Sequence, residues 1–164
     1  MTELLALAAV GALAGFYVSW TAGRLDRLHA RVDASWAALD AALVRRAAAA
    51  RAVAGQLEDP RAGAALAAAA SAALEGAVAE RERVENDLSR VLKASLPLVL
   101  HDAPGDAAMA ELRTAVTRVG LARSFHNTAV KDTRVIRLRR LPRALRLAGR
   151  RALPEYFEMD DTAL

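Results

Sequence analysis

Charged residues are absent from one long stretch near the N-terminus and frequent after it. The stretch runs from Leu4 to Ala22, LLALAAVGALAGFYVSWTA, and contains 19 residues. A helix of this length extends about 28 Å, close to the hydrocarbon thickness of a bilayer. The pattern therefore predicts a transmembrane anchor over residues 1–23 that continues directly into a charged, amphipathic helix.

The residues on either side of this stretch indicate its orientation. Tyr17 and Trp20 stand near its C-terminal end, where amphipathic rings favour the headgroup level, and Arg24 and Arg27 follow. The N-terminal side carries only Glu3. Under the positive-inside rule we expect a single-pass protein of the cell membrane, with its N-terminus outside and the remaining chain in the cytoplasm.

A cleaved signal peptide is the alternative to an anchor. Ala12-Leu13-Ala14 has the small residues of a cleavage site, but no Lys or Arg precedes it. The apolar run also continues well past that site, further than a signal peptide requires. Both features favour a retained anchor.

Beyond the anchor, apolar residues recur every three or four positions, which is the spacing of one helical face. Three such stripes predict three long helices, over about residues 24–57, 60–93 and 106–136. Asp59 is a suitable N-cap for the second helix, with Pro60 at its first position. The first stripe consists of Leu25, Leu28, Val32, Trp36, Leu39, Leu43, Ala47, Ala50 and Ala54.

Prolines and a glycine predict a connection between Ser95 and Asp106, with Asp106 as the cap of the third helix. Short connections between long helices favour antiparallel neighbours. The predicted fold class is therefore all-α, an N-terminal transmembrane helix continuing into an elongated antiparallel bundle of three long helices plus a short C-terminal basic helix. We assign the bundle to residues 24–141 and the basic helix with its acidic tail to residues 142–164.

Composition supports helices that approach one another closely. Hydrophobic residues make up 54% of the chain, but aromatic residues only 4%, so alanine supplies much of the apolar surface. Alanine is the best helix former and suits sheets poorly. The absence of cysteine excludes disulfides, thiol catalysis and cysteine-based zinc sites.

The chain resembles the LemA family of bacterial membrane proteins along its whole length. Residues 122–130, ARSFHNTAV, are similar to the family pattern A-R-x-x-Y-N-x-x-V, and Tyr156-Phe157-Glu158 is similar to its closing Y-F-E. The first predicted helix is similar to the pattern L-x-x-L-x-x-x-V-x-x-x-W-x-x-I/L-D-x-x-L-x-R-R through Leu25, Leu28, Val32, Trp36, Leu39, Asp40, Leu43, Arg45 and Arg46. The resemblance implies an N-terminal transmembrane helix, an antiparallel bundle and a partner protein in the membrane, but no particular activity. It implies packing roles for Trp36, Asp40, Arg46, Arg123, His126 and Asn127.

Two departures from the family pattern identify a divergent, alanine-enriched member. Residues 47–54 are largely alanine where the family has a Pro-Asn-Leu-Val run, and His126 stands where the family has tyrosine. Because His126 falls on the apolar stripe, we interpret it as a packed aromatic residue with Asn127 nearby. Trp36 and Asp40 are one turn apart, and we interpret them as a structural pair with Arg123 across the bundle.

The sequence provides no pattern typical of a catalytic or metal site. His29, His101 and His126 lie on different predicted elements, and His101-Asp102 reads as a pair in the Pro-rich connection. The charge run over residues 80–87 is typical of a solvated helix face. No phosphate-binding glycine loop or nucleophile elbow occurs. We therefore predict no catalytic residues, no cofactor and no metal.

A basic segment at residues 134–151 is the one surface that stands out. It holds eight arginines and no acid, whereas the whole chain has 23 basic and 19 acidic residues, so the positive charge is local. Its leucines recur at helical spacing, which indicates a basic amphipathic segment, kinked or restarted at Pro142. The candidate contacts for an anionic surface are Arg137, Arg139, Arg140, Arg143, Arg146, Arg150 and Arg151.

Three interpretations of this segment stay open. It can contact the anionic cytoplasmic leaflet, bind nucleic acid, or form a solvated arginine face that packs its leucines on the bundle. The anchor favours the lipid bilayer, and the lack of interleaved aromatic residues disfavours nucleic acid. With three antiparallel helices, however, the segment lies at the end away from the membrane unless the chain turns back at Pro142. The acidic tail can also fold back on it; its members are Glu155, Glu158, Asp160 and Asp161.

Two classes of function follow from these patterns. The first is a membrane-anchored, non-enzymatic scaffold or interaction protein of the LemA type, bound to the lipid bilayer and to a membrane protein partner. The second is a subunit of a membrane-associated enzyme complex whose site is assembled across subunits. Homo-oligomerisation is compatible with both classes.

Overall fold

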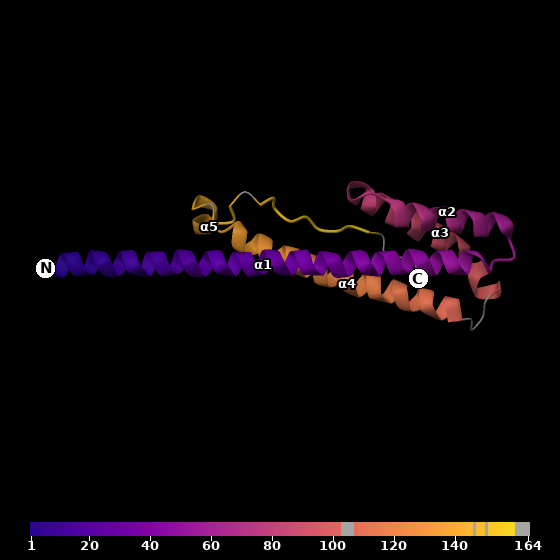
Figure 1. Cartoon of the computed structure of the whole chain (residues 1–164), viewed down its shortest axis with the longest axis horizontal. Helices are drawn as coiled ribbons and strands as arrows, with labels where there is room; N and C mark the ends of the chain where they lie inside the picture. Colours follow the sequence, from indigo (N-terminus) through magenta and orange to yellow (C-terminus); the bar gives the residue numbers. More distant parts are fainter. Residues whose placement is uncertain (103–106, 146, 150, 160–164) are drawn as a thin grey trace. The chain divides into compact units, whose positions relative to one another are not determined.

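All regular secondary structure in the described part of the chain is helical, which confirms the all-α class. The computed structural model describes residues 1–102, 107–145, 147–149 and 151–159. Asp106, the predicted cap of the last long helix, lies outside these residues. Figure 1 labels the α-helices; with the short 3-10 helix η1, the elements are α1 (Thr2–Ala54), α2 (Pro60–Glu75), η1 (Val78–Glu80), α3 (Arg81–Asp102), α4 (Ala107–Arg137) and α5 (Arg140–Ala144).

Helix α1 joins the apolar N-terminal stretch to the first amphipathic stripe. It runs for 53 residues from Thr2 to Ala54 without a break. Among the described residues, it is the one helix long and apolar enough, by length and composition, to cross a membrane. The predicted long apolar helix at the N-terminus is confirmed in this sense.

Helix α2 begins where its capping residues predict. The Asp59 carboxylate accepts a hydrogen bond from the backbone N–H of Arg61 at 2.9 Å, and Pro60 is the first helical residue. This carboxylate satisfies one of the N–H groups that have no partner within the helix.

The second predicted helix, over residues 60–93, is wrong, because the chain forms two helices there. Gly76 has an extended backbone with φ −61° and ψ 132°, and it ends α2. A Cβ at this position would lie 2.9 Å from Val84 Cγ2 and 3.1 Å from the Ala72 carbonyl oxygen, so the tight approach requires glycine. The apolar spacing continues across the break, and the sequence pattern alone therefore conceals it.

Helix α3 also extends further than predicted. Pro97 lies inside the helix, and the helix ends at Asp102 rather than before Ser95. Proline removes one backbone donor, but a helix held by tertiary packing can continue past it with a local distortion. His101 and Asp102 therefore belong to the last turn of α3, not to a connecting loop.

The chain divides into two compact units, and each is described by itself. The bundle unit comprises residues 36–126 together with the chain from Phe157 onward. Its main core contains side chains from four helices, α1, α2, α3 and α4, whereas the sequence pattern predicts three. The buried members are Ala47, Ala49, Ala50, Val53, Ala54, Leu66, Ala70, Ala73, Val84, Leu88, Leu92, Met109, Leu112 and Ala115.

The anchor unit comprises residues 1–35 and 127–156. Val32 of α1 packs with Ala129 and Val130 of α4. The Thr133 hydroxyl donates to the Ala129 carbonyl at 2.8 Å, and its oxygen lies 3.5 Å from the Leu28 carbonyl oxygen. Later residues of α4 therefore lie beside earlier residues of α1 within this unit.

Exposure along α1 changes sharply at Thr21. Up to Trp20 the residues are exposed, apart from half-buried Val18. From Thr21 the helix buries one face at three- and four-residue intervals, through Leu25, His29 and Val32. The uncovered apolar part of the helix is therefore about 30 Å long, sufficient for a bilayer core.

The same register places the arginine segment near the uncovered end of α1. Because Thr133 lies beside Leu28, α4 reaches the level of Arg24 at Arg137, about 6 Å further along. The expectation placed the segment at the opposite end unless the chain turned back at Pro142. It assumed three long helices, whereas the break at Gly76 divides the second one into α2 and α3.

We predict that Gly63→Ala destabilises the bundle unit by about 1 to 3 kcal/mol. A Cβ at Gly63 of α2 would lie 2.8 Å from the carbonyl oxygen of Ala54, a backbone atom that cannot rotate away. Urea unfolding of the full chain in detergent micelles, followed by circular dichroism, measures the change.

Gly120→Ala is the matched control for this variant. Nothing lies within 4 Å of a Cβ at Gly120, inside α4. We expect it to raise the free energy of unfolding by about 0.5 to 1 kcal/mol, because alanine favours helix over glycine. Equal effects of the two substitutions would contradict the close approach of α1 and α2.

Candidate functional site

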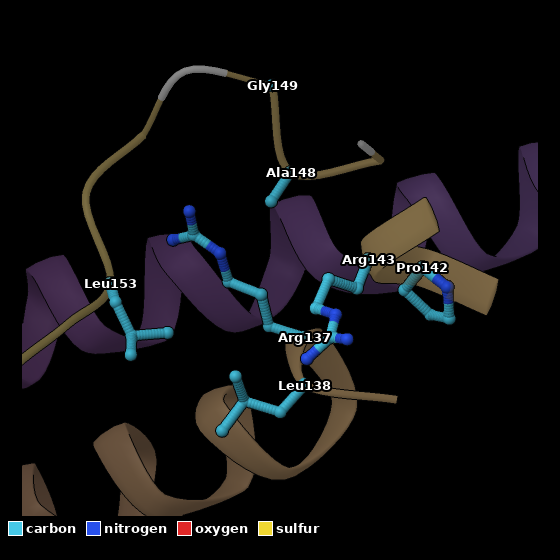
Figure 2. A pocket seen from close by; sticks show the side chains of 7 residues that line it. All are labelled: Arg137, Leu138, Pro142, Arg143, Ala148, Gly149 and Leu153. Atoms are coloured by element: carbon cyan, nitrogen blue, oxygen red, sulfur yellow. The ribbon is translucent and has the colours of Figure 1, made fainter. Parts of the chain in front are cut away.

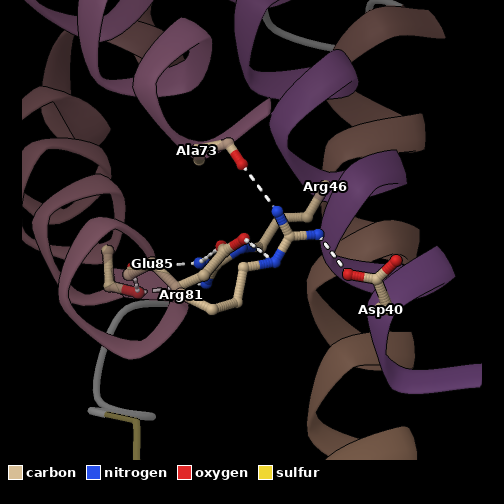
Figure 3. A network of polar contacts seen from close by, with 6 residues as sticks. Asp40, Arg46, Ala73, Arg81 and Glu85 are labelled. Atoms are coloured by element: carbon tan, nitrogen blue, oxygen red, sulfur yellow. Dashed lines mark hydrogen bonds and ion pairs between the residues drawn. The ribbon is translucent and has the colours of Figure 1, made fainter. Parts of the chain in front are cut away.

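A network of buried charges in the bundle unit connects α1 to α3 (Figure 3). Arg46 of α1 and Glu85 of α3 are 1% and 0% exposed. Arg46 Nη2 donates to Glu85 Oε2 at 2.6 Å and to the Glu85 carbonyl at 3.0 Å, and its Nη1 donates to Ser89 Oγ at 3.0 Å. Glu85 and Ser89 are four residues apart, so both face the same guanidinium.

Arg81 extends this network to α2 and to Asp40. Its Nη1 donates to the Ala73 carbonyl at 2.9 Å, which satisfies one of the last carbonyls of α2. Its Nη2 donates to Asp40 Oδ1 at 2.5 Å, and its Nε lies 3.7 Å from Glu85 Oε1. The Arg81 side chain therefore connects the start of α3 to the end of α2 and forms ion pairs with two carboxylates.

Burial raises the pKa of Glu85 above its ordinary value, while the guanidiniums of Arg46 and Arg81 act in the opposite direction. A buried carboxylate of this kind is maintained only with partners of opposite charge. The four groups Asp40, Arg46, Arg81 and Glu85 balance formally to zero, which explains how an alanine-rich core accommodates them.

The prediction of a solvated charge run over residues 80–87 is wrong for two of its members. Glu80, Arg83 and Asp87 do lie on the surface and form ion pairs three and four residues apart. Arg81 and Glu85 are buried instead. The signal that could have identified them is their four-residue spacing beside the apolar positions of the same helix, together with Arg46 inside an apolar stripe.

A cavity of about 260 Å³ borders the network in the bundle unit. Trp36, Val44 and Leu74 line it together with Asp40 and Arg81. The two charged groups form an ion pair with each other. Within the described residues, no group of three His, Asp or Glu side chains could hold a metal ion.

Trp36 is the centre of an aromatic cluster in the bundle unit. Its ring centroid lies 5.5 Å from that of His126 and 5.7 Å from that of Phe157. His126 is therefore packed among aromatic rings, and Asn127 beside it is half-buried. Phe157 attaches the C-terminal segment to this cluster.

Asp40 and Arg123 each have a contact that the sequence did not predict. Asp40 binds Arg81, and Arg123 Nη1 donates to the Met159 carbonyl at 2.7 Å.

The expected interface residues lie at the end of the uncovered part of α1. Tyr17 and Trp20 are 41% and 50% exposed, and the Arg24 guanidinium lies 5.6 Å from the Trp20 ring centroid. Arg27 is exposed one turn further along. His29 is buried in the same unit, where its Nδ1 lies 2.8 Å from the Leu25 carbonyl.

Some arginines of the basic segment hold the chain that follows. Arg134 donates to the Pro154 carbonyl at 2.9 Å and lies over the Tyr156 ring. Arg137 donates to the carbonyls of Ala152 and Arg151. These bonds keep the C-terminal segment, which has no regular structure, against α4.

The remaining described arginines of this segment face outward. Arg139, Arg140 and Arg143, at α5, are exposed, and Arg151 forms an ion pair with Asp33 at 3.7 Å. Arg146 and Arg150 lie outside the described residues.

Three leucines of the basic segment are largely exposed. Leu138, Leu141 and Leu145 are 52%, 57% and 51% exposed, whereas Leu147 is half-buried. The interpretation of a solvated arginine face expects leucines that pack on the bundle, but these three are exposed together with the arginines.

The acidic tail does not cover this surface in the described residues. The Glu158 N–H donates to Glu82 Oε1 at 3.0 Å, in the bundle unit, and Glu155 is exposed. Asp160 and Asp161 lie outside the described residues.

Comparison of this sequence and structure with protein-family models, curated proteins and solved structures gives no match.

We predict that Arg46→Ala destabilises the bundle unit by about 3 to 5 kcal/mol, because it leaves the buried Glu85 carboxylate without its main partner. The double variant Arg46→Leu with Glu85→Leu removes both charges and should recover most of this loss. Urea titration in detergent micelles measures the free energy of unfolding of the unmodified full chain and of both variants.

Arg45→Ala is the matched control, since Arg45 also pairs with a glutamate, Glu111, but on the surface. We expect it to change the stability little, because exposed ion pairs contribute weakly. A small effect of Arg46→Ala, similar to that of Arg45→Ala, would contradict the structural importance of the buried pair.

Proposed function

We propose that this chain is a membrane-anchored, non-enzymatic scaffold of the LemA type, with an antiparallel helical bundle that binds a protein partner at the membrane. In this proposal residues 1–23 are a single-pass anchor, the N-terminus faces outward and the bundle lies in the cytoplasm. The partner is a membrane protein, and the lipid bilayer is the second contact.

The observation that carries the proposal is the change of exposure along α1. Seventeen successive uncharged positions, residues 4–20, are uncovered apart from half-buried Val18, and the burial pattern of a globular protein begins at Thr21 of the same helix. A soluble protein does not maintain an uncovered apolar helix of this length, because its exposure to water is unfavourable and promotes aggregation. A bilayer removes that cost.

The charged residues next to this stretch support the orientation. Arg24 and Arg27 follow the apolar part directly, and the register of α4 adds the arginines of residues 134–151 at the same end. The N-terminal side offers only Glu3. The positive-inside rule favours a cytoplasmic bundle through Arg24 and Arg27, and the arginines of residues 134–151 are compatible with an anionic cytoplasmic leaflet at that end.

The ionisable groups of the bundle unit support a scaffold over an enzyme. Asp40, Arg46, Arg81 and Glu85 form ion pairs with one another. An enzyme subunit with a site shared across chains is the second candidate. The cavity beside Trp36 favours it, because Asp40 and Arg81 converge there.

We predict that the full chain resists alkaline carbonate extraction of membranes. Leu13→Arg should shift a large fraction into the soluble or aggregated pool, because an arginine near the middle of the span costs about 2.5 to 3.5 kcal/mol. Leu121→Arg is the control: Leu121 is also exposed, but in the bundle unit. Release of the unmodified chain by carbonate would refute the anchor.

The orientation has an independent test, because the chain has no cysteine. We expect a membrane-impermeant maleimide to label Thr2→Cys in intact cells, and Arg113→Cys only after permeabilisation. Both positions are exposed, so accessibility reports the side of the membrane. Labelling of Arg113→Cys in intact cells would reverse the proposed topology.

A further inference from the structure

A small cavity lies within the anchor unit, between α5 and the end of α4 (Figure 2). Its volume is about 280 Å³. Arg137 and Arg143 line it together with Pro142, Leu153 and the turn at Ala148–Gly149. Neither the scaffold role nor the bundle core uses this cavity.

The side chain of Arg137 is held in place at this cavity. Its two terminal nitrogens donate to the carbonyls of Ala152 and Arg151, so the guanidinium cannot swing away freely. Figure 2 shows this side chain between Leu153 and Ala148. The turn on the other side contains Gly149 with φ +59°, a left-handed conformation that glycine adopts without strain.

The charge of the cavity is positive and not compensated by its own lining. Among the described residues, its lining has two guanidiniums and no carboxylate. Two acids of this unit pair with other arginines: Asp132 forms an ion pair with Arg31, and Asp33 with Arg151. Guanidiniums with this surplus of charge favour a phosphate or similar oxyanion, to which they donate two hydrogen bonds at once.

Exposed leucines surround the cavity, although a site for a free anion does not require apolar side chains. Leu138, Leu141 and Leu145 stand exposed among the arginines. Leucines and arginines exposed together are typical of a segment that lies in the interface plane of a membrane. Arg137 is also level with Arg24, just beyond the uncovered apolar part of α1.

We propose that this cavity binds the headgroup of an anionic phospholipid in the leaflet next to the bundle. Arg137 and Arg143 bind the phosphate, and the exposed leucines contact the upper part of the acyl chains. This inference rests on the proposed membrane anchoring, because that anchoring brings the cavity to the headgroup level.

The full chain in neutral detergent micelles provides the test, with native mass spectrometry to measure the lipid-bound fraction. The probes are dioleoyl phosphatidylglycerol, dioleoyl phosphatidylcholine and inorganic phosphate. We expect the chain to retain phosphatidylglycerol at least about tenfold more strongly than phosphatidylcholine, the result for one well-formed charge-assisted contact. Inorganic phosphate should not displace the lipid, because it lacks the acyl chains.

Three variants separate a specific cavity from general attraction to positive charge. Arg143→Gln should weaken phosphatidylglycerol binding at least about fivefold, because it removes a charge-assisted hydrogen bond to the phosphate. Ala148→Phe keeps every charge but fills the cavity, and should weaken binding at least as much. Arg139→Gln removes the same charge from the same segment outside the cavity, and should leave binding within about twofold.

Three results would overturn the proposal. Equal losses in Arg143→Gln and Arg139→Gln would indicate diffuse attraction, and unchanged binding in Ala148→Phe would place the lipid elsewhere. Full competition by inorganic phosphate would identify a site for free anions. Lipid binding in micelles is measured without a bilayer, so the two proposals can fail separately. If carbonate releases the chain but the three variants change lipid binding as expected, the anchor alone is refuted. If the chain resists carbonate but the variants do not change lipid binding as expected, the lipid site alone is refuted.

Discussion

The buried contact between Arg46 and Glu85 is the constraint on which the bundle unit depends. Half of the buried residues in the surrounding core are alanine, whose small side chain packs equally well at several relative positions of two helices. Hydrogen bonds to a guanidinium are directional, so Arg46 can satisfy Glu85 and Ser89 together in one register only. We infer that the polar network selects the register, while the alanines provide the close approach. A buried ion pair of this kind contributes more to specificity than to stability.

Several elements could be predicted from the sequence because they depend on local chemistry. The uncharged run at residues 4–22 and the stripe after it were sufficient for α1, and Asp59 with Pro60 marked the start of α2. The break at Gly76 could not be predicted this way, since the need for glycine there comes from the close approach of Val84 in the following helix. A single glycine in an alanine-rich run carries no local signal of that contact.

The candidate site could also be predicted only where local chemistry decides, and not where tertiary contacts decide. The arginines of residues 134–151 were evident from composition, but their location depended on how many helices precede them. The burial of Arg81 and Glu85 was missed because a charge run is normally solvated, and both residues are charged like their exposed neighbours. Only the partner on α1, distant in sequence, distinguishes them. Charge patterns therefore indicate which residues are ionised, but tertiary contacts decide which of them are buried.

The attachment of the C-terminal segment has a consequence for sequence variation. Arg134 and Arg137 hold residues 151–154 through backbone carbonyls, and Arg123 holds Met159 in the same manner. A carbonyl is present whatever the side chain, so residues that accept these bonds can be exchanged without loss of the attachment. Arg137 has no such freedom, because lysine lacks the planar fork that reaches two carbonyls at once. Related chains should therefore vary along this segment of irregular backbone while retaining Arg137.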